Sequence, residues 1–276
     1  MGLRKLYHLM LPQLRSWGLS VGRDRLFSLA RKYDLLALTS SSRPSRQTTY
    51  PGRLRHPNLL TQHWPMHPGQ ALTVDITYLF TREGHRYLFL VMDFYSRFLL
   101  GWHLSDSLGT KGALLALQRA LRALKALKAL EAVEGLDLNS EKVSLKGVSL
   151  KEVGEQSVQG RGRREQRRKP FQGVIHHSDH GVQYTSRIYQ QALIRKGLLP
   201  SMGRLGNAYD NARMERAIGT LKREYGIEGP FPTEKDALLA VKEAIGLYNH
   251  ERPHWALALA TPAQVHFGSG RWEGNV

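Results

Sequence analysis

The chain of 276 residues contains no cysteine. This absence excludes structural disulfides and any zinc finger built on cysteine, and it fits a reducing cytoplasm. Long apolar runs are also missing, since no stretch approaches the roughly 18 residues of a membrane-spanning helix. The N-terminal residues include basic side chains but no apolar run that would suit a signal peptide. The sequence therefore predicts a soluble protein of the cytoplasm.

Acidic residues are scarce relative to basic ones. The chain has 40 lysines and arginines against 23 aspartates and glutamates, which gives a formal net charge of +17. A basic excess of this size favours a polyanionic partner, with nucleic acid the first expectation and an anionic membrane surface the second. Some proteins are basic without such a partner. The length leaves room for one large domain with its own core and a smaller region beside it.

Two short amphipathic helices are predicted near the N-terminus, over residues 3–17 and 21–36. A short turn containing glycine joins them, so residues 1–38 resemble a helix-turn-helix unit. Arg23 and Arg25 lie on the basic face of the second helix and are candidates for DNA contact. The inward face of that helix is predicted to consist of Leu26, Phe27, Leu29 and Ala30. Many helical hairpins bind nothing, and the pattern alone leaves that alternative open.

The largest predicted unit spans residues 68–250, and a basic linker over residues 39–67 precedes it. Three strands rich in β-branched and aromatic residues come first, and the short turns between them predict an antiparallel meander. A long helix with leucines three or four residues apart follows. These four elements are predicted at residues 71–80, 86–93, 98–105 and 109–133.

The amino-acid composition changes at residues 134–172, which contain a near-repeat and then a strongly basic stretch low in apolar residues. We expect most of this segment to be a flexible insertion. Strands and helices resume after it, and residues 251–276 are expected to pack on the core as an irregular tail. The later strands are predicted at 171–176 and 198–201, and the later helices at 186–196, 207–225 and 233–249.

Three acidic residues occupy unusual positions in this pattern. Asp75 lies within an apolar strand, where a charge is costly unless it is paired or binds a metal. Asp179 follows a short apolar strand, at the end where α/β proteins often place their sites, and Glu215 lies on a helix. A single such acid is usually structural, but three on separate elements of a basic chain favour a divalent-metal site. Two Mg²⁺ ions held by carboxylates can support phosphoryl transfer.

The helix that carries Glu215 groups three polar side chains. Asn211 lies four residues before Glu215 and Lys222 seven after it, so the three share one face. Asp210 and Glu224 point away from that face, so the helix geometry selects Glu215 as its functional acid. Asn211 and Lys222 are candidates for DNA contact. The same face could equally be a solvated surface with ordinary Glu–Lys pairs.

A histidine-rich loop offers a competing interpretation, because a His/Asp cluster could bind zinc for hydrolysis. The cluster would consist of His176, His177, Asp179 and His180. Only half of the HxHxDH pattern of metallohydrolases is present, since Ile175 occupies the place of its first histidine. Asp93 and Asp106 also lie at predicted strand ends. We interpret both as turn or cap residues, with Asp93 the nearer of the two to the site.

Several motifs together resemble one family. They are the two N-terminal helices, VDITY around Asp75, MDFYSR around Asp93, HHSDHGVQYTS around Asp179, SMGRLGNAYDNARMERAIGTLKRE around Glu215, and YNHERPHWALALATP near the end. Between Asp179 and Glu215 lie 35 residues (215 − 179 − 1), a spacing characteristic of that family. The chain resembles the insertion-sequence transposases of the retroviral-integrase (DDE) superfamily, OrfB type.

The resemblance implies an α/β, ribonuclease-H-like fold with a five-stranded mixed sheet flanked by helices, preceded by the small helix-turn-helix-like region. It implies that Asp75, Asp179 and Glu215 are catalytic and hold two Mg²⁺ or Mn²⁺ ions. The implied activity is metal-dependent DNA strand cleavage and strand transfer at insertion-sequence ends, which amounts to DNA transposition, integration and recombination. Lys222 matches the family's basic residue for DNA contact.

The implied partners are double-stranded DNA, at transposon ends and target, further copies of the chain, and the product of the upstream reading frame. No membrane partner is expected, and the expected location is the cytoplasm, in association with the nucleoid. Between Asp75 and Asp179 lie 103 residues (179 − 75 − 1), more than is usual for the family, and the excess coincides with residues 134–172. The alternative is a DNA-binding regulatory or decayed copy without catalytic activity.

Overall fold

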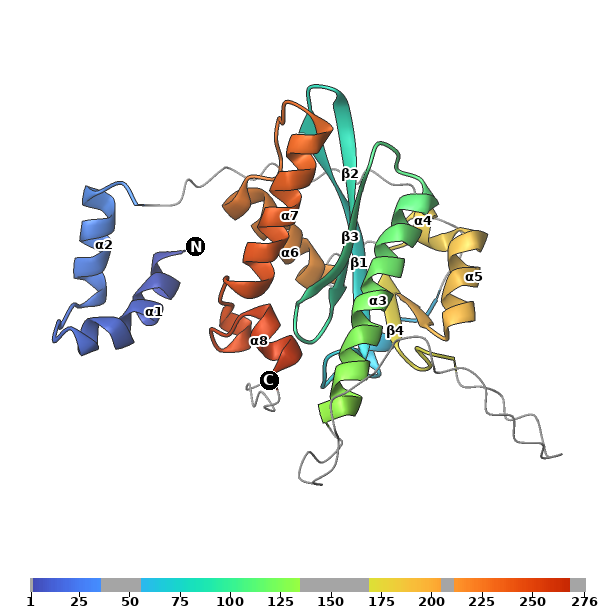
Figure 1. Cartoon of the computed structure of the whole chain (residues 1–276), viewed down its shortest axis with the longest axis horizontal. Coiled ribbons are helices and arrows are strands. Elements are labelled where there is room, and N and C mark those ends of the chain that lie inside the picture. Colours follow the sequence, from blue (N-terminus) through green and yellow to red (C-terminus); the bar gives the residue numbers. More distant parts are fainter. Residues whose placement is uncertain (1, 36–55, 135–168, 205–210, 269–276) are drawn as a thin grey trace, which may run out of the picture.

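The computed structural model describes residues 2–35, 56–134, 169–204 and 211–268. A single sheet with helices on both faces forms the body of the molecule, and two N-terminal helices lie to one side of it (Figure 1). Most of the 134–172 insertion, and the predicted helix start at Asn207, fall outside the described residues. The predictions for those segments therefore stay predictions.

The sheet has five strands in the order β3-β2-β1-β4-β5. Their bounds are β1 Ala71–Thr81, β2 Gly84–Asp93, β3 Leu99–Ser105, β4 Ile175–Ser178 and β5 Leu199–Met202. The first three form the predicted antiparallel meander, while β4 runs parallel to β1 and β5 runs parallel to β4. This mixed order is that of the ribonuclease-H-like fold, so the predicted fold class is confirmed.

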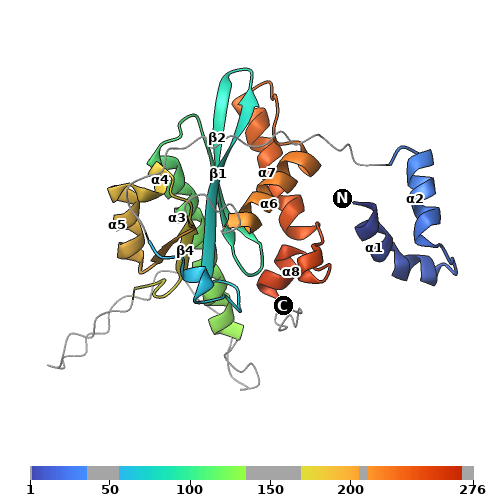
Figure 2. The same cartoon turned by 180° about the vertical axis from the view of Figure 1, so that it is seen from behind.

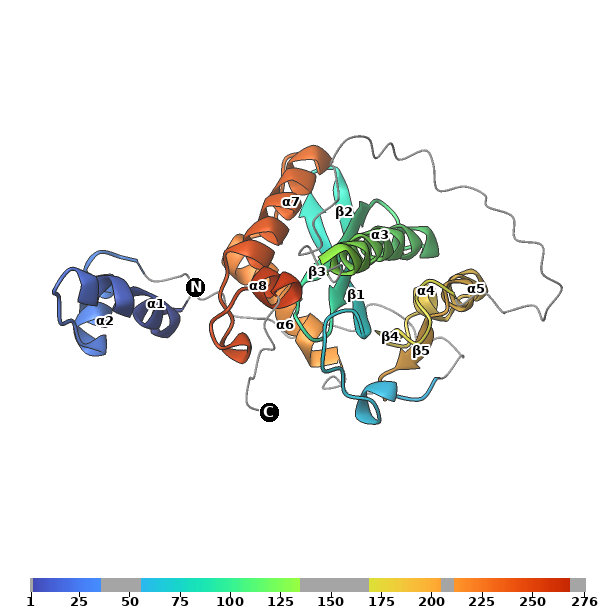
Figure 3. The same ribbon diagram turned by 60° about the horizontal axis from the view of Figure 1, so that its bottom comes forward.

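One face of the sheet is covered by α3 (Thr110–Glu134) and α5 (Arg187–Lys196), as Figure 3 shows from below. Leu72 and Val74 of β1 point to this side, into a core that includes Leu117, Leu121 and Leu124 of α3. The helix lies very close to β3 at Gly101, where a Cβ would come 2.5 Å from the backbone of α3. A glycine is therefore required at this crossing, because any side chain would push the helix off the sheet.

The opposite face is covered by α6 (Ala212–Tyr225) and α7 (Glu234–His250), which are seen from behind in Figure 2. Leu79 of β1 and Leu88 and Leu90 of β2 meet these helices. Since both faces of β2 are covered, its sequence is a nearly continuous apolar run rather than an alternating one. Thr73 and Asp75 alternate with Leu72 and Val74, so the strand pleat directs them to the side of α6.

Three details differ from the sequence predictions. The strand predicted at 171–176 begins only at Ile175, because Gly173 adopts a φ of +88° and residues before it form a turn. The tail contains a short 3₁₀ helix, Trp255–Leu257, and a helix, α8 (Pro262–Phe267), where an irregular segment was predicted. Thr261 caps α8 and exchanges hydrogen bonds with Gln264, a capping box that the sequence pattern contained.

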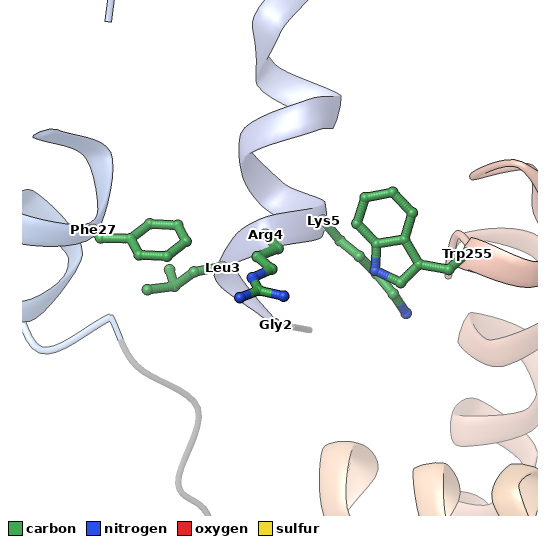
Figure 4. A pocket seen from close by; sticks show the side chains of 6 residues that line it. All are labelled: Gly2, Leu3, Arg4, Lys5, Phe27 and Trp255. Carbon is green, nitrogen blue, oxygen red and sulfur yellow. The ribbon is translucent and has the colours of Figure 1, made fainter. Parts of the chain in front are cut away.

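The N-terminal helices are α1 (Leu3–Ser16) and α2 (Arg23–Lys32). The second is shorter than predicted, and Leu29 is 36% exposed rather than inward, whereas Ala30 is buried. Lys5 donates a hydrogen bond to the carbonyl of Pro253 at 3.3 Å, and the rings of His8 and Trp255 are 5.1 Å apart. A cavity of about 440 Å³ lies next to these contacts; it is lined by Gly2, Leu3, Arg4, Lys5, Phe27 and Trp255 (Figure 4).

Candidate active site

Asp75 and Asp179 come from neighbouring parallel strands. Thr73 of β1 is paired with His177 of β4. Asp75 and Asp179 are each two residues further along, so both lie just beyond the same end of the paired segment. The Asp75 carboxylate accepts a hydrogen bond of 2.7 Å from the N–H of Ile76. Burial, together with the charges of the two other acids, raises the pKa of Asp75 to about 8.

The loop after β4 shapes the surroundings of Asp179. Its carboxylate accepts a hydrogen bond from the N–H of Gly181 at 3.0 Å, and burial raises its pKa. A Cβ at position 181 would meet the same carboxylate oxygen at 3.0 Å, so glycine lets the loop turn tightly beneath the acid. His180 donates from Nε2 to the carbonyl of Gly203 at 2.6 Å, which fixes the other side of the loop.

Glu215 lies in the first turn of α6 and is exposed at its surface. Asn211, immediately before the helix, donates from Nδ2 to the carbonyl of Val74 at 3.3 Å and so joins the start of α6 to β1 beside Asp75. The other side-chain atom of Asn211, Oδ1, is buried and has no hydrogen-bond partner among the described residues. Partial burial raises the pKa of Glu215.

The three predicted acids share one electrostatic neighbourhood, because the charges of Asp179 and Glu215 both raise the pKa of Asp75. They are not, however, a preformed ligand set: in the described ranges, no three His, Cys, Asp or Glu side chains are grouped so that they could hold a metal ion. The carboxylate oxygens of the three acids suit a hard cation, since carboxylates are the ligands that Mg²⁺ prefers. Asn211, whose Oδ1 is buried and unpartnered among the described residues, bonds the carbonyl of Val74, the residue before Asp75. The metal-ligand assignment stays a prediction.

The histidines of the alternative zinc cluster have structural hydrogen bonds. His176 bonds the Tyr189 hydroxyl through Nε2 at 2.9 Å, and burial lowers its pKa to about 3. His177 bonds the Ser201 hydroxyl through Nδ1 at 2.9 Å. These contacts join β4 to α5 and β5. The described part of the chain contains no zinc-type cluster at this loop, and the histidines are best understood as core residues.

Asp93 has the turn role predicted for it, and the role predicted for Asp106 stays a prediction. The buried Asp93 carboxylate accepts hydrogen bonds from the N–H of Gly69 and the N–H of Ser96, both at 2.7 Å, and from the Ser96 hydroxyl at 2.8 Å. It thereby organises the turn between β2 and β3. Asp106 is exposed in the turn after β3.

The predicted DNA-contact residues differ in exposure. Lys222 is only partly exposed: its ammonium lies 4.7 Å from the centroid of the Tyr78 ring and 3.8 Å from the Glu228 carboxylate, and burial lowers its pKa. Arg23 is exposed and forms a 3.0 Å ion pair with Asp24. Arg25 is exposed on α2, and Asn211 faces β1 as described above.

Residues that support the site from a distance were not singled out in the sequence. Asn249 of α7 accepts from the N–H of Leu99 at 2.9 Å and donates to its carbonyl at 3.1 Å. Arg252 binds Glu224 at the end of α6 through two hydrogen bonds of 2.8 and 2.7 Å. Both belong to the YNHERPH motif, so the motif is a structural support for α6 and α7. The motif itself was the signal that could have revealed this role.

Comparison with known proteins gives one family model that matches, the Integrase core domain, over residues 196–262. These residues include Glu215, α6 and α7. Among solved structures, the HTLV-2 integrase catalytic core domain in complex with magnesium is similar at 12% identity and a TM-score of 0.43. That likeness covers 73% of this chain and 98% of that core.

Relatives in sequence are more informative. An insertion element IS600 protein of 31 kDa from Shigella sonnei is 31% identical over 259 residues, which cover 91% of this chain and 77% of that protein. The transposase for insertion sequence element IS904 from Lactococcus lactis subsp. lactis is 28% identical over 90% of this chain and 82% of its own length. A putative transposase for IS986/IS6110 from Mycobacterium tuberculosis is 28% identical over 85% and 71%. The chain therefore belongs to the insertion-sequence transposases that carry an integrase core domain.

Proposed function

We propose that the chain is the catalytic subunit of a transposase, which cleaves DNA at the ends of an insertion sequence and joins the freed 3′ ends to target DNA. The observation that carries this proposal is the register of two parallel strands, in which Asp75 lies two residues beyond Thr73 and Asp179 two residues beyond its partner His177, together with the charges of Asp179 and Glu215 that act on Asp75. Three acids in one electrostatic neighbourhood of a chain of charge +17 suit a reaction on a phosphodiester.

In this proposal Asp75, Asp179 and Glu215 hold two Mg²⁺ or Mn²⁺ ions. When bound, such ions activate the attacking oxygen and stabilise the leaving oxygen of an in-line phosphoryl transfer. Burial is the main cause of the raised pKa of Asp75, and the charges of Asp179 and Glu215 add to it. A bound cation would offset both effects, which supports the assignment. Exposure of Glu215 allows its side chain to adjust, while Asp75 and Asp179 are held by hydrogen bonds from Ile76 and Gly181.

Double-stranded DNA is the proposed substrate and partner. The basic excess supplies attraction for phosphates, with Lys222, Asn211, Arg23 and Arg25 as the proposed contacts. Further copies of the chain are proposed to assemble on DNA, because two transposon ends must be paired, and the upstream reading-frame product is proposed to assist end recognition. No helix in the described residues is long and apolar enough to cross a membrane. We propose that the protein associates with the nucleoid.

The alternative of a DNA-binding copy without catalysis gains no support from the chain. All three acids and Lys222 are present, and the 103 residues between the first two acids have not displaced β4 from its place beside β1. The added length is accommodated between α3 and β4. A nuclease without strand transfer would use the same acids. Only the products of the reaction distinguish such a nuclease from a transposase.

Titration calorimetry with Mn²⁺ tests the proposed site, using the full chain, Asp179→Asn, and Asp106→Asn as the matched control. We expect the wild type and Asp106→Asn to bind Mn²⁺ and Asp179→Asn to lose most of that binding, because its amide cannot supply the negative charge. Supercoiled plasmid carrying the element's end would be nicked by the wild type and by Asp106→Asn, and not by Asp179→Asn. Equal Mn²⁺ binding by all three proteins would contradict the assignment of Asp179.

A further inference from the structure

A pocket of about 400 Å³ lies beside the acids, within the size range of small-ligand sites. Its lining includes Thr73 of β1, Asn211 and Arg213 at the start of α6, and Trp64. Thr73 precedes Asp75 by two residues on the same side of the strand, so their Cα atoms are about 7 Å apart. Any group in the pocket would therefore be an immediate neighbour of the phosphodiester at the acids.

The exposed Trp64 ring of this pocket is held in position by its neighbours. Trp64 is 54% exposed, which is unusual for so large an apolar ring. Its ring meets the buried Phe94 ring edge-on with centroids 5.2 Å apart, and the Arg213 guanidinium lies 4.8 Å from its centroid. Arg213 is itself held, because Nη1 donates to the carbonyl of Phe94 at 2.7 Å. An exposed indole with this support offers a flat surface for stacking.

Two residues of the lining carry a buried polar atom without a partner. The Thr73 hydroxyl is buried, with the residue 1% exposed, and Oδ1 of Asn211 is buried as well. Neither has a hydrogen-bond partner in the described structure. Buried polar atoms nearly always find partners, and a ligand that enters the pocket would supply them. A hydroxyl and an amide oxygen can meet both the donors and the acceptors on the edge of a nucleobase.

The chemistry of the pocket favours a base over a phosphate. Its single cationic group, Arg213, is already committed to the Phe94 carbonyl and to two aromatic faces. The remaining lining is apolar or uncharged: Asn58, Leu60, Thr61 and Ala212. A stacking ring with hydrogen-bonding edges, rather than an anion, matches these walls.

We propose that this pocket receives one unpaired nucleobase of the DNA strand whose phosphodiester is cleaved, stacked on Trp64 and hydrogen-bonded to Thr73 and Asn211. The inference rests on the proposed function, and it adds a positioning role for the pocket. Extraction of a base next to the acids would place the neighbouring phosphodiester and would separate the two strands at the transposon end.

The test combines protein variants with DNA variants in one cleavage assay. The full chain with Mn²⁺ is given duplex oligonucleotides from the element's flanking repeats, either intact or with one abasic nucleotide at each position around the cleaved bond. Trp64→Ala is expected to slow cleavage of the intact end about tenfold, the loss of one base–aromatic stacking contact. Trp64→Phe should restore most of the rate, and Thr73→Val should give a smaller loss.

The decisive outcome is the response to an abasic end. With the abasic nucleotide at the position that enters the pocket, wild type and Trp64→Ala are expected to cleave at rates within about twofold, because neither can stack a missing base. Trp255→Ala removes an exposed tryptophan (49% exposed) elsewhere and should behave as wild type on every substrate. Melting temperatures of all variants are measured to identify any that fail to fold.

Two results would overturn the inference, and they are distinguishable. If Trp64→Ala is slow by the same factor on intact ends and on every abasic end, while Asp179→Asn abolishes cleavage, the proposed function stands and the base pocket does not. The pocket would then be filled by the chain itself or would serve stability alone. If the wild type cleaves no end, either alone or fused to the product of its upstream reading frame, the proposed function fails and this inference fails with it.

Discussion

The guanidinium of Arg252 binds both carboxylate oxygens of Glu224, from Nε at 2.8 Å and from Nη2 at 2.7 Å. This pair connects the last turn of α6 to the segment after α7. Burial acts to raise the pKa of Glu224, but the hydrogen bonds and charge of Arg252 outweigh it and lower the pKa. Since Glu215 lies on the same helix, this pair contributes to the position of the proposed catalytic acid.

We predict that Arg252→Met lowers the free energy of unfolding by about 3 kcal/mol, because it removes two charge-assisted hydrogen bonds from a partly buried carboxylate. Urea denaturation at pH 7 measures the loss. The stabilisation depends on the ionised carboxylate of Glu224, so it is present above pH 4.5 and is lost as the pH falls through the lowered pKa. The matched control is Arg23→Met, whose exposed pair with Asp24 should contribute less than about 1 kcal/mol. Equal losses in both variants would contradict the prediction.

We predict that the metal-free protein is stabilised by Asp75→Asn at alkaline pH. The pKa of Asp75 is raised from 3.8 to about 8 in the folded chain, first by burial and then by Asp179. The folded state therefore binds the proton more tightly, and its stability falls as the pH rises from about 4 towards 8. In EDTA at pH 8.5, Asp75→Asn should melt roughly 5 °C above wild type, and the difference should shrink at pH 4.

Added Mn²⁺ should reverse this order, because it stabilises the carboxylate of the wild type and not the amide. Asp106→Asn, at an exposed turn, serves as the control and should follow wild type under both conditions. A lower melting temperature for Asp75→Asn at every pH without metal would show that Asp75 acts as a structural hydrogen-bonding residue.

We predict that Lys222→Gln weakens DNA binding without a preference for sequence. The ammonium lies near the end of α6, between Tyr78 and Glu228, and a phosphate would compete with the Glu228 carboxylate 3.8 Å away. Loss of one phosphate contact should reduce the slope of log affinity against log salt by about 1. Fluorescence anisotropy across a salt series measures the slope. Lys242→Gln, on the exposed side of α7, is the control; an unchanged slope for Lys222→Gln would remove Lys222 from the interface.

Much of the fold could be predicted because its elements have strong local patterns. The β-branched and aromatic residues of β1, the apolar run of β2 and the leucine spacing of α3 each reflect burial that is visible in the sequence. The strand predicted at residues 171–176 was placed too early because Gly173 takes a left-handed conformation, which an apolar pattern does not reveal. The helix α8 was missed although Thr261, Pro262 and Gln264 form a helix-start signal.

The site was predictable only in part, for a physical reason. Asp75 was identifiable because a charge in an apolar strand needs an explanation, and Glu215 because helix geometry separates it from Glu224. The pocket was not predictable, since Trp64 and Arg213 are 149 positions apart (213 − 64) and meet only through the folding of the chain. Its unpartnered polar atoms become visible only when burial is known.

A strand-transfer assay tests the central claim most directly. The chain, alone and fused to the product of its upstream reading frame, is incubated with Mn²⁺ and oligonucleotides carrying the element's flanking repeats. Wild type is compared with Glu215→Gln, and with Glu243→Gln as an exposed control on α7. We predict joined products from wild type and Glu243→Gln, and none from Glu215→Gln. Joined products from Glu215→Gln at the wild-type rate, or none from any protein that still binds DNA, would contradict the account.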